Sequence, residues 1–162
     1  MNNYFRSESE FKEWLNSDDE FRDEYDEVEV EGDVTLHDGY SGYSLTSLPK
    51  NLKVGGSLDL TGCSSLASLP EGLELRGYLY LKGCTSLTSL PEGLKVGGDL
   101  YVGGSGVADV ESHPGVEGKK VGVALWLERC TSLTSLPEGL DVWGWDLNLE
   151  RCTSLTSLPE GL

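Results

Sequence analysis

The sequence has few basic residues. Twelve lysines and arginines stand against 28 aspartates and glutamates in 162 residues, which gives a net charge of −16 at pH 7. A surface of this charge repels nucleic acid, anionic membranes and acidic substrates, and it attracts basic proteins. Residues 1–33 hold 13 of the acids but only Arg6, Lys12 and Arg22 as bases, a net charge of −10. We therefore expect a protein partner with a basic surface, and we expect neither direct nucleic-acid binding nor membrane binding.

Long apolar runs are also missing. No stretch approaches the roughly 20 consecutive apolar residues of a membrane-spanning helix. The first residues, Met1 to Arg6, are followed by acids and not by the apolar core of a secretory signal peptide. These absences predict a cytoplasmic protein of a bacterium, or of the infected host cell if a phage encodes it.

The residues of common catalytic and metal sites are sparse or wrongly spaced. The four cysteines include no Cys-x-x-Cys pair, and His37 and His113 are the only histidines, so we expect no zinc site. The glycines are not followed by the helix N-terminus that a phosphate-binding loop requires. Among 28 acidic residues, carboxylate pairs occur everywhere and indicate no particular chemistry. We expect a protein that is not an enzyme and that holds no cofactor.

What the sequence does contain is a repeat. The nine residues SLTSLPEGL at 132–140 recur unchanged at 86–94 and 154–162, with one change at 65–73 and with two at 44–52. All six prolines belong to this series, at spacings of 21 to 23 residues: Pro49, Pro70, Pro91, Pro114, Pro137 and Pro159. A fixed short period is typical of a solenoid, in which each unit buries its apolar face against its neighbours.

Each repeat also contains a short segment with apolar residues on both sides of a variable one, as in Leu79-Tyr80-Leu81. This alternation is typical of a half-buried strand. Six such segments occur, at 34–36, 58–60, 79–81, 100–102, 125–127 and 147–149, and residues 28–30 lead into the first of them. Stacked in parallel, they predict a mainly β solenoid with a sheet of about six rungs. A second apolar pair, such as Leu73 and Leu75, precedes the bend into the next strand.

The unit Leu79-x-Leu81-x-x-Cys84-x-x-Leu87-x-x-Leu90-Pro91-x-x-Leu94 resembles the short bacterial type of leucine-rich repeat. The resemblance covers residues 34–162, with cysteine at the position usually given to asparagine. It implies a parallel sheet, and because no room is left for a helix on the convex side, we expect flat rungs. Some bacterial effectors with such repeats carry a separate ubiquitin-ligase domain, for which no residues remain, so we do not expect that activity.

The acidic segment before the repeats has the pattern of a helix over residues 7–27. Ser7 and Glu10 fit a capping box, and Phe11, Trp14 and Leu15 share one face. We expect residues 1–30 to form an acidic helical cap over the first rung and residues 31–162 to form the solenoid. The acids of this segment are candidate partner-binding residues: Asp18, Asp19, Glu20, Asp23, Glu24, Asp26 and Glu27.

Four cysteines share one position of the repeat: Cys63, Cys84, Cys130 and Cys152. We expect a column of buried, reduced thiols. Distance alone permits disulfides between neighbours, but a cytoplasmic location disfavours them. Ser105 takes this position in an irregular rung between residues 102 and 121, whose inserted loop holds further candidate contacts: His113, Lys119 and Lys120.

The variable residues of the strands form the outer face of the expected sheet. Aromatic residues gather at its centre with acids around them: Tyr78, Tyr80, Tyr101 and Trp126, then Asp59, Asp99 and Glu128. Aromatics are good strand formers in any case, but an exposed aromatic patch is also typical of a protein interface. We predict a non-enzymatic protein-binding module, an inhibitor or adaptor whose acidic and aromatic surfaces engage a basic, nucleic-acid-binding partner.

The chain also resembles small, very acidic inhibitor proteins of bacteria and their phages, including some aimed at host defence nucleases. This resemblance implies anti-defence activity in which acidic groups imitate the phosphates of a nucleic acid. Two alternatives stay open. The Tyr and Trp row would suit a carbohydrate-binding module, with the rings as stacking platforms. A structural or assembly role would use the last rung as a homodimer interface, formed by Leu155, Leu158, Leu162, Trp143 and Trp145.

Overall fold

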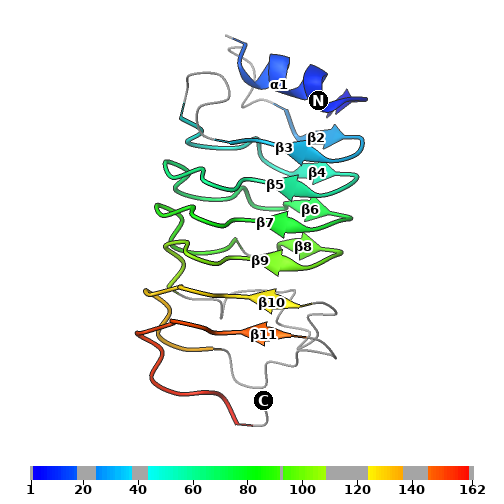
Figure 1. Cartoon of the computed structure of the whole chain (residues 1–162). Coiled ribbons are helices and arrows are strands. Elements are labelled where there is room, and N and C mark those ends of the chain that lie inside the picture. Colours follow the sequence, from blue (N-terminus) through cyan, green and yellow to red (C-terminus); the bar gives the residue numbers. More distant parts are fainter. Residues whose placement is uncertain are drawn as a thin grey trace.

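The computed structural model describes residues 2–17, 25–37, 44–91, 93–108, 124–136 and 146–160. In these ranges the chain winds into a stack of similar turns that carry two parallel sheets (Figure 1). Sheet A has the order β1-β2-β4-β6-β8, with β1 at Asn2–Phe5, β2 at Glu27–Val30, β4 at Leu52–Val54, β6 at Glu74–Leu75 and β8 at Lys95–Val96. The prediction of a mainly β solenoid with parallel strands is confirmed.

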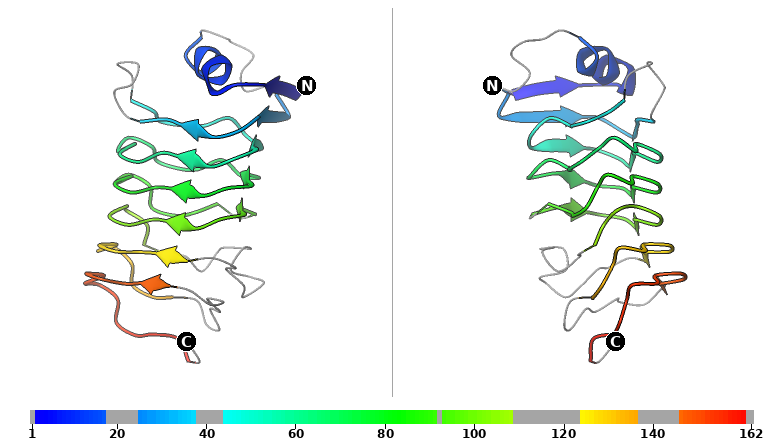
Figure 2. Two further views of the ribbon diagram at one scale, coloured as in Figure 1. Left: turned by 45° about the vertical axis from the view of Figure 1, so that its right-hand side comes forward. Right: turned by 90° about the vertical axis from the view of Figure 1, so that its left-hand side faces the viewer.

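Sheet B contains the six strands that the alternating pattern predicted. Its order is β11-β10-β9-β7-β5-β3, with β3 at Val34–Thr35, β5 at Leu58–Asp59, β7 at Leu79–Tyr80, β9 at Leu100–Tyr101, β10 at Leu125–Trp126 and β11 at Leu147–Asn148. Equivalent leucines pair across the sheet, Leu58 with Leu79 and Leu79 with Leu100. Each turn therefore adds one short strand to sheet B, and the two sheets lie on different sides of the stack (Figure 2).

Leucine columns fill the interior between the sheets. Leu58 and Leu79 of sheet B, Leu73 beside sheet A, and Leu66 and Leu87 of the Leu-x-x-Leu-Pro side are all fully buried. Burying one such side chain stabilises the fold by about 1.5–3 kcal/mol. Because the three sides of each turn contribute to one continuous core, every turn depends on its neighbours for burial.

The turn before the cysteine column needs a left-handed backbone. Glycine supplies it in three turns, at Gly62, Gly83 and Gly104, with φ of 79°, 77° and 66°. Arg129 and Arg151 take the same position with φ of 61° and 62°, a conformation that costs a residue with a Cβ roughly 1–2 kcal/mol. The later turns therefore keep the repeat geometry at a local cost.

The N-terminal segment differs from the expected long helix. Helix α1 spans only Glu8–Leu15, with the Ser7 Oγ accepting the Glu10 N–H at 3.3 Å as the capping box predicts. Glu27, expected at the end of the helix, begins strand β2, in which buried Val28 and Val30 alternate with half-buried glutamates and pair in register with Leu52 and Val54. Residues 2–5 form β1, which pairs with β2. Residues 18–24 lie outside the described ranges.

An aromatic cluster joins α1 to the strands beside it. Phe11 is fully buried, and its ring lies 5.6 Å from that of Phe5 in an edge-on arrangement. The Trp14 ring lies 5.2 Å from Phe5 and 5.7 Å from Tyr25. These contacts hold α1 at the N-terminal end of the stack (Figure 1). Over the described residues, the structure contains no helix long and apolar enough to cross a membrane.

Glu8 of α1 closes the free edge of sheet B. Its Oε1 accepts the Thr35 N–H of β3 at 2.7 Å and forms an ion pair with Lys12 Nζ at 2.8 Å. Burial opposes ionisation of this carboxyl, but the hydrogen bonds from Lys12 and Thr35 outweigh it, so its pKa lies below the ordinary value of 4.5. A lowered pKa adds stability above pH 4.5, and this contribution disappears as the pH falls through the folded-state pKa.

We expect the substitution Glu8→Gln to weaken the fold at neutral pH and to change it little at low pH. Urea unfolding at about pH 7 and about pH 3 measures both effects. Glu13→Gln is the matched control, since Glu13 is exposed on the same helix and the charge change is identical. An equal loss at both pH values for Glu8→Gln would contradict the role given to its carboxylate.

The cysteine column has the predicted character. All four cysteines are free thiols, three of them buried and Cys152 partly exposed. Each Sγ donates to a carbonyl of the preceding turn, as Cys63 does to Leu36 O at 3.0 Å and Cys84 to Leu60 O at 3.2 Å. Ser105 is buried in the same column, and its Oγ lies 4.0 Å from Cys130 Sγ, where either atom can be the hydrogen-bond donor. The thiols therefore act as hydrogen-bond donors between turns.

Burial should control how fast these thiols react. It raises the pKa of Cys130 and of Cys152 and so lowers their thiolate fractions. We expect iodoacetamide at about pH 8 to label Cys152 slowly and first, and to label Cys63, Cys84 and Cys130 only when denaturant is added. Peptide mass spectrometry over a time course distinguishes the four sites. Equal labelling of all four in the folded protein would contradict the buried column.

Candidate binding surface

The register of sheet B places the predicted aromatic residues in one column. Asp59 pairs with Tyr80, Tyr80 with Tyr101, Tyr101 with Trp126 and Trp126 with Asn148. Because the leucine and valine residues on either side of Tyr80, Tyr101 and Trp126 are buried in the core, these aromatic side chains point outward. The prediction that Tyr80 and Tyr101 share a face is confirmed.

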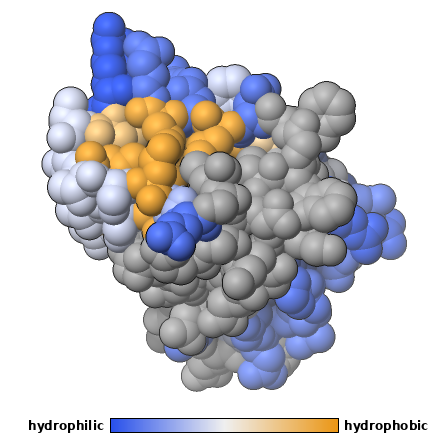
Figure 3. Space-filling model, turned by 90° about the horizontal axis from the view of Figure 1, so that it is seen from below, coloured by the Kyte–Doolittle hydropathy of each residue, from blue (hydrophilic) through white to orange (hydrophobic). Residues whose placement is uncertain are grey.

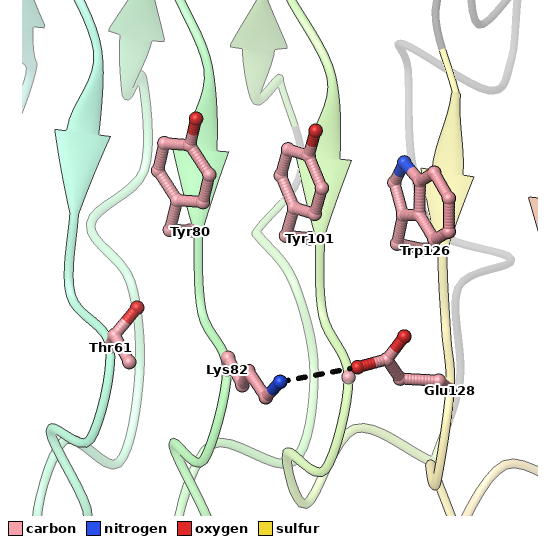
Figure 4. A pocket seen from close by; sticks show the side chains of 7 residues that line it. Thr61, Tyr80, Lys82, Tyr101, Trp126 and Glu128 are labelled. Atoms are coloured by element: carbon pink, nitrogen blue, oxygen red, sulfur yellow. Dashed lines mark ion pairs between the residues drawn. The ribbon is translucent and has the colours of Figure 1, made fainter.

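The rings stack on one another along this column. The Tyr80 and Tyr101 centroids are 4.7 Å apart with 13° between the planes, and those of Tyr101 and Trp126 are 5.9 Å apart with 8°. The first spacing is about that of neighbouring strands, so the rings stand upright, face to face (Figure 4). Tyr78 joins the row at 6.2 Å and 58° from Tyr80 and is 44% exposed. The row therefore presents ring edges to a partner.

The polar atoms of the row point in one direction. Figure 4 shows the hydroxyls of Tyr80 and Tyr101 and the indole nitrogen of Trp126 directed toward the start of their strands. The Tyr101 hydroxyl donates to Asp99 Oδ2 at 3.1 Å. Burial, and then this hydrogen bond, raise the pKa of Tyr101, while burial and then the neighbouring Tyr78 and Asp59 raise the pKa of Tyr80. Both phenols are therefore neutral at physiological pH.

The indole nitrogen of Trp126 is buried and, within the described residues, finds no acceptor. A buried donor without a partner costs about 1–3 kcal/mol. Stacking of the indole on Tyr101 holds it in this place. The position is thus favoured by ring packing and not by hydrogen bonding.

The acids around the row differ in how many of their carboxylate oxygens accept hydrogen bonds. Asp99 is fully engaged, since its Oδ1 accepts the Ala124 N–H at 3.1 Å and its Oδ2 accepts the Tyr101 hydroxyl. Asp59 uses Oδ1 to accept the Thr61 N–H at 2.9 Å, and Asn148 does the same for Glu150 at 2.9 Å. Because the neutral amide of Asn148 accepts the equivalent hydrogen bond in the last turn, the negative charge of Asp59 is not needed for this contact.

A hollow of about 300 Å³ opens beside the ring row, lined by Thr61, Tyr80, Lys82, Tyr101, Gly103, Trp126 and Glu128. Gly103 has no side chain, so Lys82 reaches across its turn to Glu128, with 3.3 Å between Nζ and Oε1 (Figure 4). A Cβ at Gly103 would come within 2.7 Å of Glu128 Cγ. The hollow therefore exists because this one turn lacks a side chain.

The two sheets differ in charge. Along the strands of sheet A the column Glu29, Lys53, Glu74, Lys95 alternates in sign, and ion pairs join Lys53 to Glu27 at 2.5 Å and Lys95 to Glu74. The outer face of sheet B carries six acids, of which Glu128 pairs with Lys82 and Glu150 with Arg151: Asp33, Asp59, Asp99, Glu128, Asp146 and Glu150. The charges on the strands of sheet A are nearly balanced, whereas sheet B keeps the larger acidic excess, six acids against two bases.

The other predicted site residues do not gather around the ring row. Glu27 lies on sheet A, paired with Lys53, and Asp26 is exposed just before β2. Five further acids lie outside the described residues: Asp18, Asp19, Glu20, Asp23 and Glu24. So do six other candidates: His113, Lys119, Lys120, Trp143, Trp145 and Leu162. The sequence analysis did not identify Lys82 and Gly103 as site residues. The one feature that could have indicated them is that they occupy the same position of the repeat as Glu128.

The last described turn exposes apolar side chains. Leu147 and Leu149 are half-buried, whereas Leu125 and Leu127, their equivalents one turn earlier, are 2% and 0% exposed. Leu155 is also half-buried, and Leu158 is 57% exposed. Figure 3 views the stack from this end and shows apolar atoms at the surface. Among the described residues, no three His, Cys, Asp or Glu side chains are placed to hold a metal ion.

Comparison with known proteins gives no relative: no family model, curated protein or solved structure matches the chain.

Proposed function

We propose that this protein is a non-enzymatic binding module of the leucine-rich-repeat kind, an inhibitor or adaptor whose sheet B face engages a basic protein. The observation that carries the proposal is the coincidence of the aromatic row with the charged sheet. Tyr80, Tyr101 and Trp126 stand at the centre of a face with six acids and two bases. Rigid aromatic anchors surrounded by charge of one sign are typical of interfaces that choose an oppositely charged partner.

The arrangement of the acids suits a partner that normally binds nucleic acid. Four of the six acids flank the last three strands of sheet B, from β9 to β11, so the negative charge gathers toward one end of the face: Asp99, Glu128, Asp146 and Glu150. A basic groove would meet several negative charges held on a rigid support. In a phage-encoded protein this would be an anti-defence inhibitor. Residues 1–30 act in this proposal as the cap of the solenoid.

The ring geometry counts against the carbohydrate alternative. A sugar stacks on the exposed face of an aromatic ring, but Tyr101 has Tyr80 on one face and Trp126 on the other. The row therefore exposes the edges of its rings, whereas a sugar-binding site needs an exposed ring face. Ring edges carry partial positive charge, and they suit the carbonyl groups of a protein partner.

Two charge-matched variants test the proposal. The sheet B variant carries Asp59→Asn, Glu128→Gln and Glu150→Gln, and the sheet A variant carries Glu27→Gln, Glu29→Gln and Glu74→Gln. In pull-downs from bacterial lysate, we expect the wild type and the sheet A variant to retain the same basic protein and the sheet B variant to lose it. Retention should also fall between about 0.05 M and 0.5 M salt, as electrostatic attraction is screened. Equal retention by both variants would contradict the proposal.

Self-association through the last turn is a second candidate, favoured by the exposure of Leu158 at 57%. Two copies would cover Leu147, Leu149 and Leu155 mutually. We expect light scattering to give the mass of a dimer for the wild type and of a monomer for Leu158→Asp. A wild type that stays monomeric at about 0.1 mM, well above a micromolar dissociation constant, would remove this candidate.

A further inference from the structure

We propose that the hollow on sheet B receives an arginine side chain of the partner, and that Lys82 occupies the place of that cation in the free protein. This inference rests on the proposed function, because it names the group by which a basic partner would be recognised. It assigns Glu128 as the residue that contacts the arginine and Lys82 as its internal competitor.

The size and walls of the hollow suit one long side chain. Its volume of about 300 Å³ is at the lower end of small-molecule sites. One wall is the aromatic row of Tyr80, Tyr101 and Trp126, against which the methylene stem of an arginine can pack. Gly103 forms the gap between Lys82 and Glu128, and the neighbouring turns fill the same position with larger residues.

Glu128 is held loosely in the free protein. Its Oε1 is 3.3 Å from Lys82 Nζ, and its Oε2 accepts from Asn148 Nδ2 at 3.4 Å. Both distances exceed the roughly 2.7–2.9 Å of a good charge-assisted hydrogen bond. A planar guanidinium can donate two parallel hydrogen bonds to one carboxylate, which a lysine ammonium cannot. Glu128 would therefore gain short contacts by exchanging Lys82 for an arginine.

Lys82 can leave without disturbing the fold. Its side chain is 65% exposed, and an exposed ion pair of this kind contributes little to stability. Once displaced, the ammonium moves into water at the edge of the face. The five other acids on the same face favour an approaching cation and repel an anion: Asp33, Asp59, Asp99, Asp146 and Glu150. These acids would repel a partner carboxylate that approached Lys82.

The two halves of the ion pair should respond in opposite directions. The probe is the peptide acetyl-Gly-Arg-Gly-amide, titrated while the indole N–H signal of Trp126 is followed by NMR. We expect Glu128→Gln to weaken binding about tenfold or more, since it removes a charged hydrogen bond. We expect Lys82→Met to strengthen binding about two- to fivefold, since it removes a competitor worth one surface ion pair. The same peptide with citrulline, which is uncharged, should not bind detectably.

Glu74→Gln and Lys95→Met provide matched controls, because they break an equally exposed ion pair on sheet A with the same charge changes. Each should alter binding less than about twofold. Weaker binding by Lys82→Met, unchanged binding by Glu128→Gln, or equal binding of the citrulline peptide would overturn the inference. If the sheet B variant nevertheless loses its partner in the pull-down, the face binds without an arginine pocket. If neither experiment responds, the proposed function fails as well.

Discussion

Replacing Leu79 by alanine should lower the free energy of unfolding by about 2–5 kcal/mol. Leu79 is fully buried in the middle of sheet B and pairs with Leu58 on one side and Leu100 on the other. Hydrogen bonds fix its turn to both neighbours, for example Leu79 N–H to Asp99 O at 3.0 Å. The turns can therefore not close over the missing volume, and the cavity remains.

Urea unfolding followed by circular dichroism measures this loss. Leu158→Ala is the control, since the same side chain is 57% exposed there and its truncation should change stability by less than about 0.5 kcal/mol. Because each turn is buried only by its neighbours, Leu79→Ala should also broaden the transition. Similar losses for both variants would mean that the leucine columns do not form the core described above.

The second large effect concerns binding: Tyr101→Ala should weaken retention of the partner by about 2 kcal/mol or more, roughly 30-fold. Tyr101 is the ring that touches both Tyr80 and Trp126. Its removal separates the row into single rings and frees Asp99, whose Oδ2 then lacks its hydroxyl donor. One substitution thus removes an anchor and the order of its neighbours.

Tyr4→Ala is the control for this prediction, because Tyr4 is 53% exposed on sheet A with its hydroxyl bonded to Glu31. It should leave retention unchanged within about twofold. Thermal unfolding of both variants shows whether the solenoid is intact. An intact Tyr101→Ala protein that still retains the partner would assign the ring row a structural role alone.

The strands of sheet B could be predicted because their pattern is local and repeated. Apolar residues flank one variable residue in each of six segments, so the pairing of Tyr80 with Tyr101 follows from counting one period. The cysteine column follows in the same way. The repeat also leads directly to the acids and aromatics of the outer face, since these occupy the variable position.

Sheet A was harder to anticipate. Segments of sheet A such as Leu94-Lys95-Val96 come directly before paired glycines that indicate a turn. β1 has no counterpart in the repeat, and Val28 with Val30 belongs to a different sheet from Val34. Pairing with β4 decides this assignment, and no local pattern reveals it.

The hollow could not be predicted, because it depends on a missing side chain between residues that are far apart in the sequence. Lys82 and Glu128 are 46 positions apart in sequence and two turns apart in the stack, and they meet only because Gly103 between them has no side chain. The charge difference between the sheets is likewise invisible in the composition. A net charge of −16 does not say that the charges of sheet A are nearly balanced while sheet B keeps an excess of acids.

Photo-crosslinking from three faces tests most directly whether sheet B is the binding surface. The photoreactive residue p-benzoylphenylalanine would replace Thr61 beside the hollow, Lys53 on sheet A, or Thr88, which is exposed on the Leu-x-x-Leu-Pro side. We expect irradiation in bacterial lysate to join a basic protein to position 61 and not to positions 53 or 88. A crosslink from position 53 or 88 with none from position 61 would contradict the account.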